Sequence, residues 1–460
     1  MAIVEGAELV KHNSRQSCWL AIHGEVWDAT NFLEQHPGGA NLILNVAGTD
    51  ASDEYELFHN AELVQETLGS DAKMGTIDVL SILPKMDKKP DPVLEVKKSP
   101  PLSSMISVDD FEKVAEKTMT PTAWAYVSSG ADDEISMREN STAYQKVFLR
   151  GRILRKVGRV DCSTNILGYH STLPIYTSPV GLAKLVHPSG ECAIAAAAGN
   201  MPIEDIMGAR IAQDQVIFWQ LYADKDLEKS KTFIKRVERA GVSAIWLTVD
   251  SPVVGNRERD ERSKSVVDIE EKLEEIVETP QSIGIAKANT GFINADLDWN
   301  MIDWLRKSTR LPIVIKGIQS VEDAVSAFHH KVDGIVLSNH GGRSQDTAQP
   351  PLLTLLEIDQ YAPHILGKHM QVFVDGGIRR GTDIIKALAL GATAVGIGRP
   401  VLYSMSGGYA EHGIRRMIQI LRNELQTNMA FIGASNVKEI ERSMVNTRKL
   451  ERMMVGSVKL

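Results

Sequence analysis

The sequence predicts an α/β protein, a parallel (β/α)8 TIM barrel that follows a small α+β module. From about residue 105 to residue 440, apolar runs of strand length alternate with helical patterns, and nearly every run ends in a polar residue or a glycine. The 460 residues, 43% of them apolar, are too many for one ordinary domain and can bury a large core. We therefore expect two domains of unequal size.

Residues 1–76 form the smaller expected domain, and their charge sets them apart. Residues 1–75 contain twelve Asp and Glu against three Lys and Arg, whereas the whole chain has a formal charge of only −8. Such acidity favours a cationic protein partner over nucleic acid, although it could serve solubility alone. Three cysteines without a paired spacing argue against a disulfide framework or a zinc site, and so indicate a reducing compartment.

Two histidines beside turns are the candidate metal ligands of this module. His36 begins the turn His36-Pro37-Gly38-Gly39 and His59 follows 23 residues later, each flanked by apolar helical segments. Either could be an ordinary surface or capping residue. If they face each other across an apolar pocket, they suit a haem with two axial imidazoles.

With these histidines and Asp28-Ala29-Thr30, the module resembles the cytochrome b5 family. The resemblance implies that haem b binds here and that His36 and His59 are its axial ligands. An iron with both axial positions filled by protein is expected to carry electrons and not to bind oxygen.

A linker is expected over residues 77–104. Five prolines and five lysines lie between Ile82 and Ser104, a composition that cannot build a core and favours an extended tether. The acidic first residues are unlike an arginine-rich transit peptide, and the apolar runs are all shorter than a membrane span. We therefore expect a cytoplasmic protein without a membrane span.

Seven apolar runs in the larger domain are the expected barrel strands. A doubly wound sheet would show the same alternation, but no Gly-x-Gly-x-x-Gly opens a first helix. The runs are Pro174–Val180, Val216–Tyr222, Ala244–Asp250, Pro312–Ile318, Gly334–His340, Val372–Ile378 and Ala394–Pro400.

An eighth strand is missing from this pattern. Only Gly199-Asn200-Met201-Pro202 separates two helical segments where the second strand should lie, and four residues are too few for it. We expect either an open or rearranged barrel, or a gene prediction that lacks an exon. Residues 441–460 form a C-terminal tail after the barrel.

The stretch Ser338–Arg343 has the composition of a catalytic loop. It follows the apolar run Asp333–Leu337 and combines His340, two glycines and Arg343. At the carboxyl end of a barrel strand, these residues could bind and deprotonate a small acid. The alternative is a Gly-Gly turn with an incidental histidine.

Further polar and glycine residues follow the other strands. Two of the loops, Asp375–Arg379 and Gly398–Arg399, occur where barrels often hold a phosphate. Any one of the charged residues could instead belong to a structural ion pair. Taken together, they make residues 107–440 resemble the FMN-dependent α-hydroxyacid dehydrogenase and oxidase family.

The resemblance implies that FMN binds at the strand ends. Among these positions, Lys316 would lie by the pyrimidine edge of the flavin. The matching residues are Ser178, Pro179, Val180, Gly181, Gln220, Thr248, Lys316, Asp375, Gly376, Gly377, Ile378, Arg379, Gly398 and Arg399.

The same resemblance implies the catalytic roles. His340 would be the active-site base, and Asp250 would stabilise its imidazolium. Arg257 would add positive charge near the base and the substrate. The substrate would be held by Arg343 and Tyr126 at its carboxylate and by a hydrogen bond from Tyr222 at its hydroxyl; these assignments, too, rest on the resemblance.

Joined in one chain, the two resemblances imply oxidation of an (S)-2-hydroxy acid, L-lactate in the first instance, to the 2-oxo acid at FMN. Electrons would then pass through haem b to cytochrome c. The alternatives are an oxidase that reduces oxygen and a haem-binding protein with a defective barrel. The family also implies a homotetramer and, as an alternative compartment, the mitochondrial intermembrane space.

Two departures from the family concern the pocket. The missing segment normally supplies another flavin contact and an apolar wall of the substrate pocket. Gly181 stands where lactate-specific relatives have a slightly larger residue, which leaves room for a substrate side chain bigger than methyl.

Overall fold

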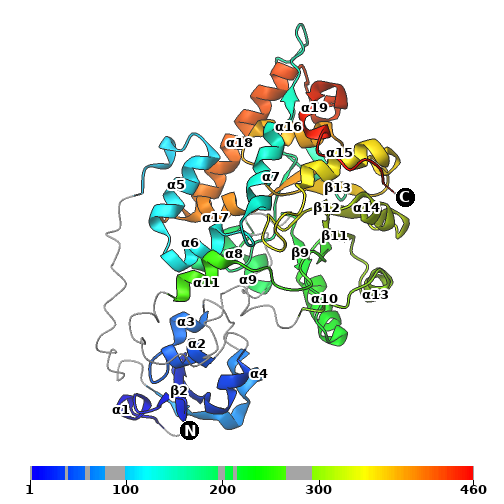
Figure 1. The fold of residues 1–460 in the computed structure, drawn as a ribbon. Coiled ribbons are helices and arrows are strands. Elements are labelled where there is room, and N and C mark those ends of the chain that lie inside the picture. The colour runs from blue at the N-terminus through cyan, green and yellow to red at the C-terminus, as the bar shows by residue number, and fades with distance from the viewer. Residues whose placement is uncertain are drawn as a thin grey trace. The chain divides into compact units, whose positions relative to one another are not determined.

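The structure is a computed structural model that describes residues 3–36, 40–56, 63–77, 99–194, 203–210, 215–265 and 293–458. Contacts divide the chain into two compact units, the first mainly within residues 1–98 and the second mainly within residues 99–258 and 292–460 (Figure 1).

The first unit is an antiparallel sheet packed with short helices, as the α+β prediction requires. Alternate side chains of the sheet, among them Leu20 and Trp27, are buried in one apolar cluster with Leu33 and Ile43 from the helical segments. The strands, in sheet order, are β1 (Asn13–Ser14), β2 (Ser17–Ile22), β3 (Glu25–Asp28) and β4 (Lys73–Thr76). The helices are α1 (Gly6–Leu9), η1 (Thr30–Gln35), α2 (Ala40–Asn45), α3 (Ser52–Glu56), α4 (Leu63–Leu68) and η2 (Ser70–Ala72).

The second unit is built on a curled parallel sheet of seven strands in the order β8-β14-β13-β12-β11-β10-β9. All residues of β10, β11, β12 and β14 are buried, as expected when both faces of a parallel sheet are covered. The strands are β8 (Ile175–Thr177), β9 (Phe218–Leu221), β10 (Ala244–Thr248), β11 (Ile313–Ile318), β12 (Gly334–Leu337), β13 (Gln371–Val374) and β14 (Ala394–Ile397).

Helices between the strands cover this sheet, and α17 and α18 follow the last strand (Figure 1). Helix α10 illustrates the local signals, because Asp226 caps its first turn and Gly241, at φ 92°, ends it. The helices are α5 (Val108–Thr118), α6 (Pro121–Ser128), α7 (Ile135–Gln145), α8 (Gly190–Ile194), α9 (Ile203–Gly208), α10 (Leu227–Ala240), α13 (Asn300–Ser308), α14 (Val321–His329), α15 (Pro351–Tyr361), α16 (Gly381–Ala389), α17 (Arg399–Met405), α18 (Ala410–Ile432) and α19 (Arg448–Glu451). Helix α11 (Glu258–Ser265) is grouped by its contacts, from Arg259 onward, with the first unit.

Short elements complete the second unit. Two antiparallel ribbons pair β5 (Phe148–Leu149) with β15 (Val445–Asn446), and β6 (Thr164–Ile166) with β7 (Tyr169–Ser171). The 3-10 turns are η4 (Leu102–Ser104), η5 (Ala183–Leu185), η6 (Pro363–Ile365), η7 (Val437–Glu439) and η8 (Arg442–Met444).

The strands are shorter than the apolar runs predict. The run ending at His340 leaves the sheet after Leu337, and the run ending at Ile378 leaves it after Val374. The cause lies in the backbone: His340 has φ 57° and Gly376 has φ 87°, values that an extended strand cannot contain. Several polar residues predicted at strand ends, among them His340 and Asp375, therefore lie in loops just beyond the strands, whereas Thr248 and Lys316 lie within β10 and β11.

Among the described residues, the parallel sheet has seven strands and no strand lies between β8 and β9 in sequence. Strand β14 pairs with β8, as the eighth and first strands of a barrel do, but β8 and β9 form the two edges of the described sheet. The predicted gap, residues 199–202, lies outside the described residues. The described sheet is thus an open, curled half-barrel.

Candidate active site

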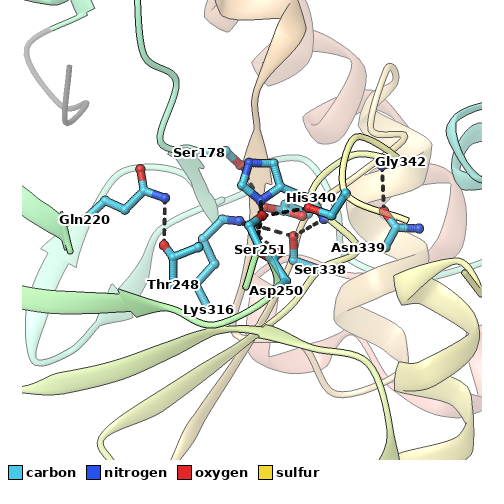
Figure 2. A network of polar contacts seen from close by, with 12 residues as sticks. Ser178, Gln220, Thr248, Asp250, Ser251, Lys316, Ser338, Asn339, His340 and Gly342 are labelled. Atoms are coloured by element: carbon cyan, nitrogen blue, oxygen red, sulfur yellow. Dashed lines mark hydrogen bonds and ion pairs between the residues drawn. The ribbon is translucent and has the colours of Figure 1, made fainter. Parts of the chain in front are cut away.

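The predicted site residues meet at the carboxyl ends of the parallel strands (Figure 2). Because all seven strands run in one direction, every loop that follows a strand lies on the same side of the sheet. Ser178 follows β8, Tyr222 follows β9 and Asp250 follows β10, while Thr248 ends β10 and Lys316 lies within β11.

A buried carboxylate lies at the centre of the site. Asp250 Oδ1 is 2.8 Å from His340 Nδ1, and Asp250 Oδ2 is 3.4 Å from Lys316 Nζ (Figure 2). The Asp250 side chain is 0% exposed, and that of His340 is 20% exposed. Asp250 therefore holds two cationic or potentially cationic groups from two other strands.

The pKa values of this cluster follow from burial and from the neighbouring charges. Burial alone would raise the pKa of Asp250, but Lys316 and His340 overcome it and hold that pKa well below its ordinary value. Burial would lower the pKa of Lys316, yet Asp250 and Asp375 raise it. For His340 burial prevails and lowers the pKa, against the pull of Asp250. The site thus holds a neutral imidazole beside a firmly ionised ion pair at neutral pH.

A bulge in β11 makes room for this ion pair. The pairing register of β11 with β12 shifts between Lys316 and Ile318, and Gly317, between them, has φ 115°. A Cβ at Gly317 would lie 2.5 Å from the Cβ of Asp250. Glycine is therefore required both by the backbone conformation and by the approach of Asp250.

The loop that carries His340 is held in a left-handed conformation. His340, Gly341 and Gly342 have φ values of 57°, 66° and 74°. Asn339 fixes this loop, because its side-chain amide exchanges two hydrogen bonds of 2.9 and 2.8 Å with that of Asn140, on α7, and accepts one from Gly342 N at 3.0 Å. The hydrogen bonds of Asn339 with Asn140 and Gly342 thus fix the loop that orients the imidazole, and they involve only groups of the protein.

Two predicted arginines surround Tyr126, on α6. The guanidinium carbon of Arg343 lies 4.8 Å from the centre of the Tyr126 ring, and that of Arg257 lies 5.9 Å from it. Tyr222, which follows β9, interacts with the same group, and burial raises its pKa to about 12. The structure therefore brings the two predicted carboxylate contacts, Arg343 and Tyr126, together with Arg257 and the predicted hydroxyl contact.

Arg399 braces the site. Its guanidinium donates to three carbonyl oxygens, those of Val127 at 3.1 Å, Gly341 at 2.9 Å and Ser129 at 2.8 Å. Burial and the nearby Arg343 lower its pKa to about 9. Arg399, predicted as a cofactor contact, therefore ties α6 to the loop that carries His340.

The predicted flavin positions form a glycine-lined rim. Gly376 and Gly377 have φ 87° and 84°, and a Cβ at Gly398 would have 3.8 Å to its nearest neighbour, the Cβ of Ser178. Buried Asp375 Oδ1 has no hydrogen-bond partner among the described residues. Buried polar atoms of this kind ordinarily have partners, so a polar ligand suits this rim.

Other predicted flavin contacts are already engaged within the protein. Gln220 Nε2 donates to Thr248 Oγ1 at 2.7 Å. Arg379, predicted to meet a phosphate, makes ion pairs of 4.0 Å with Asp109 and 3.8 Å with Glu112, both on α5. Ile378 is buried, while Pro179, Val180 and Gly181 follow Ser178 in the loop after β8.

In the first unit the described residues provide one of the two predicted haem ligands. His36 follows η1, and its ring lies edge-on to Phe32 at 5.8 Å, next to the apolar cluster of that unit. His59 lies outside the described residues. An imidazole beside an apolar cluster is suited to bind a haem. The described residues contain no group of three or more His, Cys, Asp or Glu suited to another metal.

Sequence reasoning gave no individual role to several small polar residues of the site, namely Asn140, Ser251 and Ser344, and Ser338 and Asn339 within the predicted catalytic loop. Ser338 Oγ lies 3.4 Å from Lys316 Nζ and accepts a hydrogen bond from His340 N at 3.1 Å. Their signal in the sequence was only proximity to predicted residues, since small polar residues are common in any loop.

Comparison with known proteins assigns both units. The FMN-dependent dehydrogenase family matches residues 115–447, and the cytochrome b5-like heme/steroid binding domain matches residues 5–78. The chain belongs to the FMN-dependent dehydrogenase family. Members similar to it include the L-lactate dehydrogenase (cytochrome) of Saccharomyces cerevisiae, 37% identical over 98% of this chain and 81% of the relative. That of Wickerhamomyces anomalus is 36% identical over the same shares of both chains.

Solved members of the family have the same fold. The flavin-binding domain of baker's yeast flavocytochrome b2 is 37% identical, covers 78% of this chain and 91% of its own, and superposes with a TM-score of 0.70. A mandelate oxidase structure is 32% identical, covers 74% of this chain and 98% of its own, and has a TM-score of 0.64. The predicted fold and the predicted cofactors, FMN and haem, are therefore those of this family and of its b5-like partner domain. Among the described helices, none is long and apolar enough to cross a membrane.

Proposed function

We propose that this chain oxidises L-lactate to its 2-oxo acid and passes the electrons through its own haem to a c-type cytochrome. The observation that carries the proposal is the 2.8 Å contact between His340 Nδ1 and the buried carboxylate of Asp250, in a chain that matches both cofactor-binding families. Relatives named L-lactate dehydrogenase (cytochrome) cover 98% of the chain.

In this proposal His340 is the base. Its Nδ1 carries the proton shared with Asp250, which leaves Nε2 to accept a proton from the substrate. Asp250 stays ionised throughout, because Lys316 and His340 hold its pKa low, and it offsets the charge of the imidazolium. Burial keeps His340 neutral before the reaction.

The cationic and phenolic side chains hold the substrate. Arg343 and Tyr126 bind its carboxylate, Tyr222 its hydroxyl, and Arg257 adds positive charge beside the base. The guanidinium carbons of Arg343 and Arg257 lie 4.8 and 5.9 Å from the centre of the Tyr126 ring. Two positive charges are therefore held beside the tyrosine, where they can bind a carboxylate. These roles are part of the proposal.

The residues at the strand ends fit the flavin. Lys316 would face the pyrimidine edge, the glycines of Asp375–Arg379 and Gly398 would admit the phosphate, and Asp375 Oδ1 is a buried acceptor available to a ligand. FMN when bound supplies a two-electron acceptor, and haem when bound supplies a one-electron carrier. His36 and His59 would hold the haem iron.

The test is anaerobic mixing of the purified protein with L-lactate, observed by stopped-flow absorbance. We expect loss of the flavin band first, then appearance of the reduced haem bands, and turnover with cytochrome c but little with oxygen. A flavin that is reoxidised by oxygen without haem reduction would support the oxidase, an alternative with glycolate oxidase of Spinacia oleracea, 35% identical, as a relative. Haem bands without any flavin would support the defective barrel.

The domain boundaries, the assembly and the compartment are also proposals. We infer a haem domain over residues 1–76, a linker over 77–104, a catalytic domain over 105–440 and a tail over 441–460. We further infer a homotetramer, which light scattering would test, and a location in the cytoplasm or the mitochondrial intermembrane space, which fractionation would test.

A further inference from the structure

Two serine hydroxyls lie on the Nδ1 side of His340. Ser251 Oγ is 3.2 Å from His340 Nδ1, 3.4 Å from Asp250 Oδ1 and 2.7 Å from Ser344 Oγ (Figure 2). The imidazole therefore meets a second polar group besides the carboxylate. The mechanism above gives this group no role.

The backbone is built to bring these serines together. Gly255, in the loop after β10, lies so close to the loop after β12 that a Cβ there would be 2.3 Å from the carbonyl oxygens of both Arg343 and Ser344. Arg257 Nε donates to the same Arg343 oxygen at 3.4 Å. The contact of Ser251 with Ser344 is thus one of several close contacts between the loop after β10 and the loop after β12.

Ser251 and Ser344 form a short hydrogen bond of 2.7 Å between their hydroxyl oxygens, in which either can donate, whereas Asp250 Oδ1 lies 3.4 Å from Ser251 Oγ. Because a hydroxyl oxygen has two lone pairs, Ser251 Oγ keeps one for His340 in either arrangement. A lone pair of Ser251 Oγ then faces His340 Nδ1 at 3.2 Å. The Nδ1 proton is shared between Asp250 and Ser251.

We propose that Ser251 and Ser344 are positioning residues that orient the His340 ring and stabilise its protonated form in the 2-hydroxy acid oxidation proposed above. Ser251 acts by accepting from Nδ1, and Ser344 acts through Ser251 by holding its hydroxyl in the hydrogen bond of 2.7 Å. The inference rests on the proposed function only for its kinetic test.

The other titratable groups that face His340 stay unchanged in the serine variants. They are Asp250 and Arg257 from the β10 loop, Lys316 from β11 and Asp375 from β13. A change in the protonation of His340 on removal of a serine hydroxyl therefore reports the hydroxyl itself.

The experiment compares Ser251→Ala, Ser344→Ala, Ser251→Thr and the exposed control Ser104→Ala, all as FMN- and haem-loaded full chains. One readout is the pH dependence of kcat/KM for L-lactate. The second needs no turnover: the rate at which diethyl pyrocarbonate modifies His340, measured by mass spectrometry of its peptide across pH. Loss of one acceptor to a charged group should move both profiles by about 0.5–1 pH unit.

We expect both alanine variants to shift the acid limb and the modification profile to lower pH, because the imidazolium loses an acceptor. Ser251→Thr and Ser104→Ala should retain the wild-type profiles. Superimposable profiles for wild type and both alanine variants, with unchanged melting temperatures, would overturn the inference. If the wild type did not oxidise L-lactate, the proposed function would fail, and the modification profiles would still decide the role of the serines.

Discussion

At the scale of single residues, the site depends on one carboxylate that no water reaches. Asp250 lies between Lys316 and His340; both of them shift its pKa, and Asp250 shifts the pKa of each. A buried charge is tolerable only while its partners remain. The charge state of these residues is therefore a property of the cluster.

The base can be tested by His340→Gln. A general base contributes about 10²–10⁴-fold, so we expect a loss of turnover with L-lactate in that range while the flavin and haem absorbance stay unchanged. The control is His412→Gln, because that side chain is 72% exposed and remote from the reaction. Full activity in the first variant would refute the assignment.

The lowered pKa of His340 predicts where activity falls with pH. The base must be neutral, so kcat/KM should fall as pH drops through the pKa of His340. Burial lowers that pKa, and the acid limb should therefore lie below the ordinary imidazole value of about 6.5. An acid limb above that value would show that Asp250 outweighs burial.

The buried ion pair can be tested against an exposed pair of equal length. Lys316→Met should destabilise the protein by roughly 3–5 kcal/mol, because Asp250 would lose its cationic partner in the interior. Lys113 lies 3.4 Å from Asp110, the separation found between Lys316 and Asp250, but its side chain is 71% exposed. Lys113→Met should therefore cost at most about 1 kcal/mol. Equal midpoints in urea denaturation for the two variants would contradict this.

The sign of the pH dependence follows from the same pair. The folded-state pKa of Asp250 is lowered, so its stabilisation is present above its unfolded pKa of about 3.9 and is lost as pH falls toward the folded value. The melting temperature of the second unit should hence decline below about pH 4, and less steeply in Asp250→Asn.

At the scale of elements, the loops after the strands decide the geometry of the site. The loop after β12 has three consecutive left-handed residues beginning at His340, and α7 packs against it so closely that a Cβ at Gly342 would lie 2.5 Å from Met137 N. The loop is therefore shaped by its neighbours as well as by its glycines.

Gly342→Ala and Gly168→Ala separate these two effects. Both glycines have positive φ, 74° and 86°, but a Cβ at Gly168 would meet nothing within 4 Å. The control should lose about 1 kcal/mol from the backbone alone. Gly342→Ala should lose more, by about another 1–3 kcal/mol, and should raise KM for L-lactate because Arg343 follows directly. Identical unfolding midpoints would show that α7 yields to the methyl group.

At the scale of the whole molecule, two units of different architecture have separate tasks in one chain. An antiparallel sheet with short helices contains His36, and the curled parallel sheet contains the catalytic loops. Each unit has its own buried apolar core. Loss of one cofactor should thus leave the other unit folded.

His36→Ala should abolish reduction of cytochrome c while L-lactate still bleaches the flavin, because the proposed axial ligand of the haem is lost. His23→Asn is the matched control, since His23 belongs to the same unit and its φ of 52° suits asparagine. Haem absorbance and cytochrome c reduction report the outcome. Cytochrome c reduction that survives haem loss would show that the electrons take another route.

The open side of the sheet predicts limited stability. In the described residues β8 and β9 each pair with a strand on one side alone, and an unsatisfied buried backbone group costs about 1–3 kcal/mol. We expect a version with a strand-length segment inserted after Asn200 to hold FMN more tightly and to melt at a higher temperature. An insertion of equal length rich in Gly and Ser is the control. Equal flavin content and melting temperature for the natural and restored chains would show that the gap is tolerated.

The sequence by itself determined the class of fold and the cofactors, and it predicted a gap in the sheet and most of the proposed site residues. Alternation of apolar runs with helical patterns reports burial directly. Parallel strands bring residues such as Asp250, Lys316 and His340 to one edge of the sheet, regardless of the conformation of the loops. The conformation of the loops and their side-chain contacts were decided by the tertiary structure. Only the tertiary structure showed that Asn140, on α7, holds Asn339, that Arg399 binds backbone carbonyls, and that Ser251 and Ser344 meet beside His340. These contacts join residues up to 272 positions apart in the sequence. A side chain whose partner is that distant produces no periodic pattern in the sequence around it, so the contact could not be predicted.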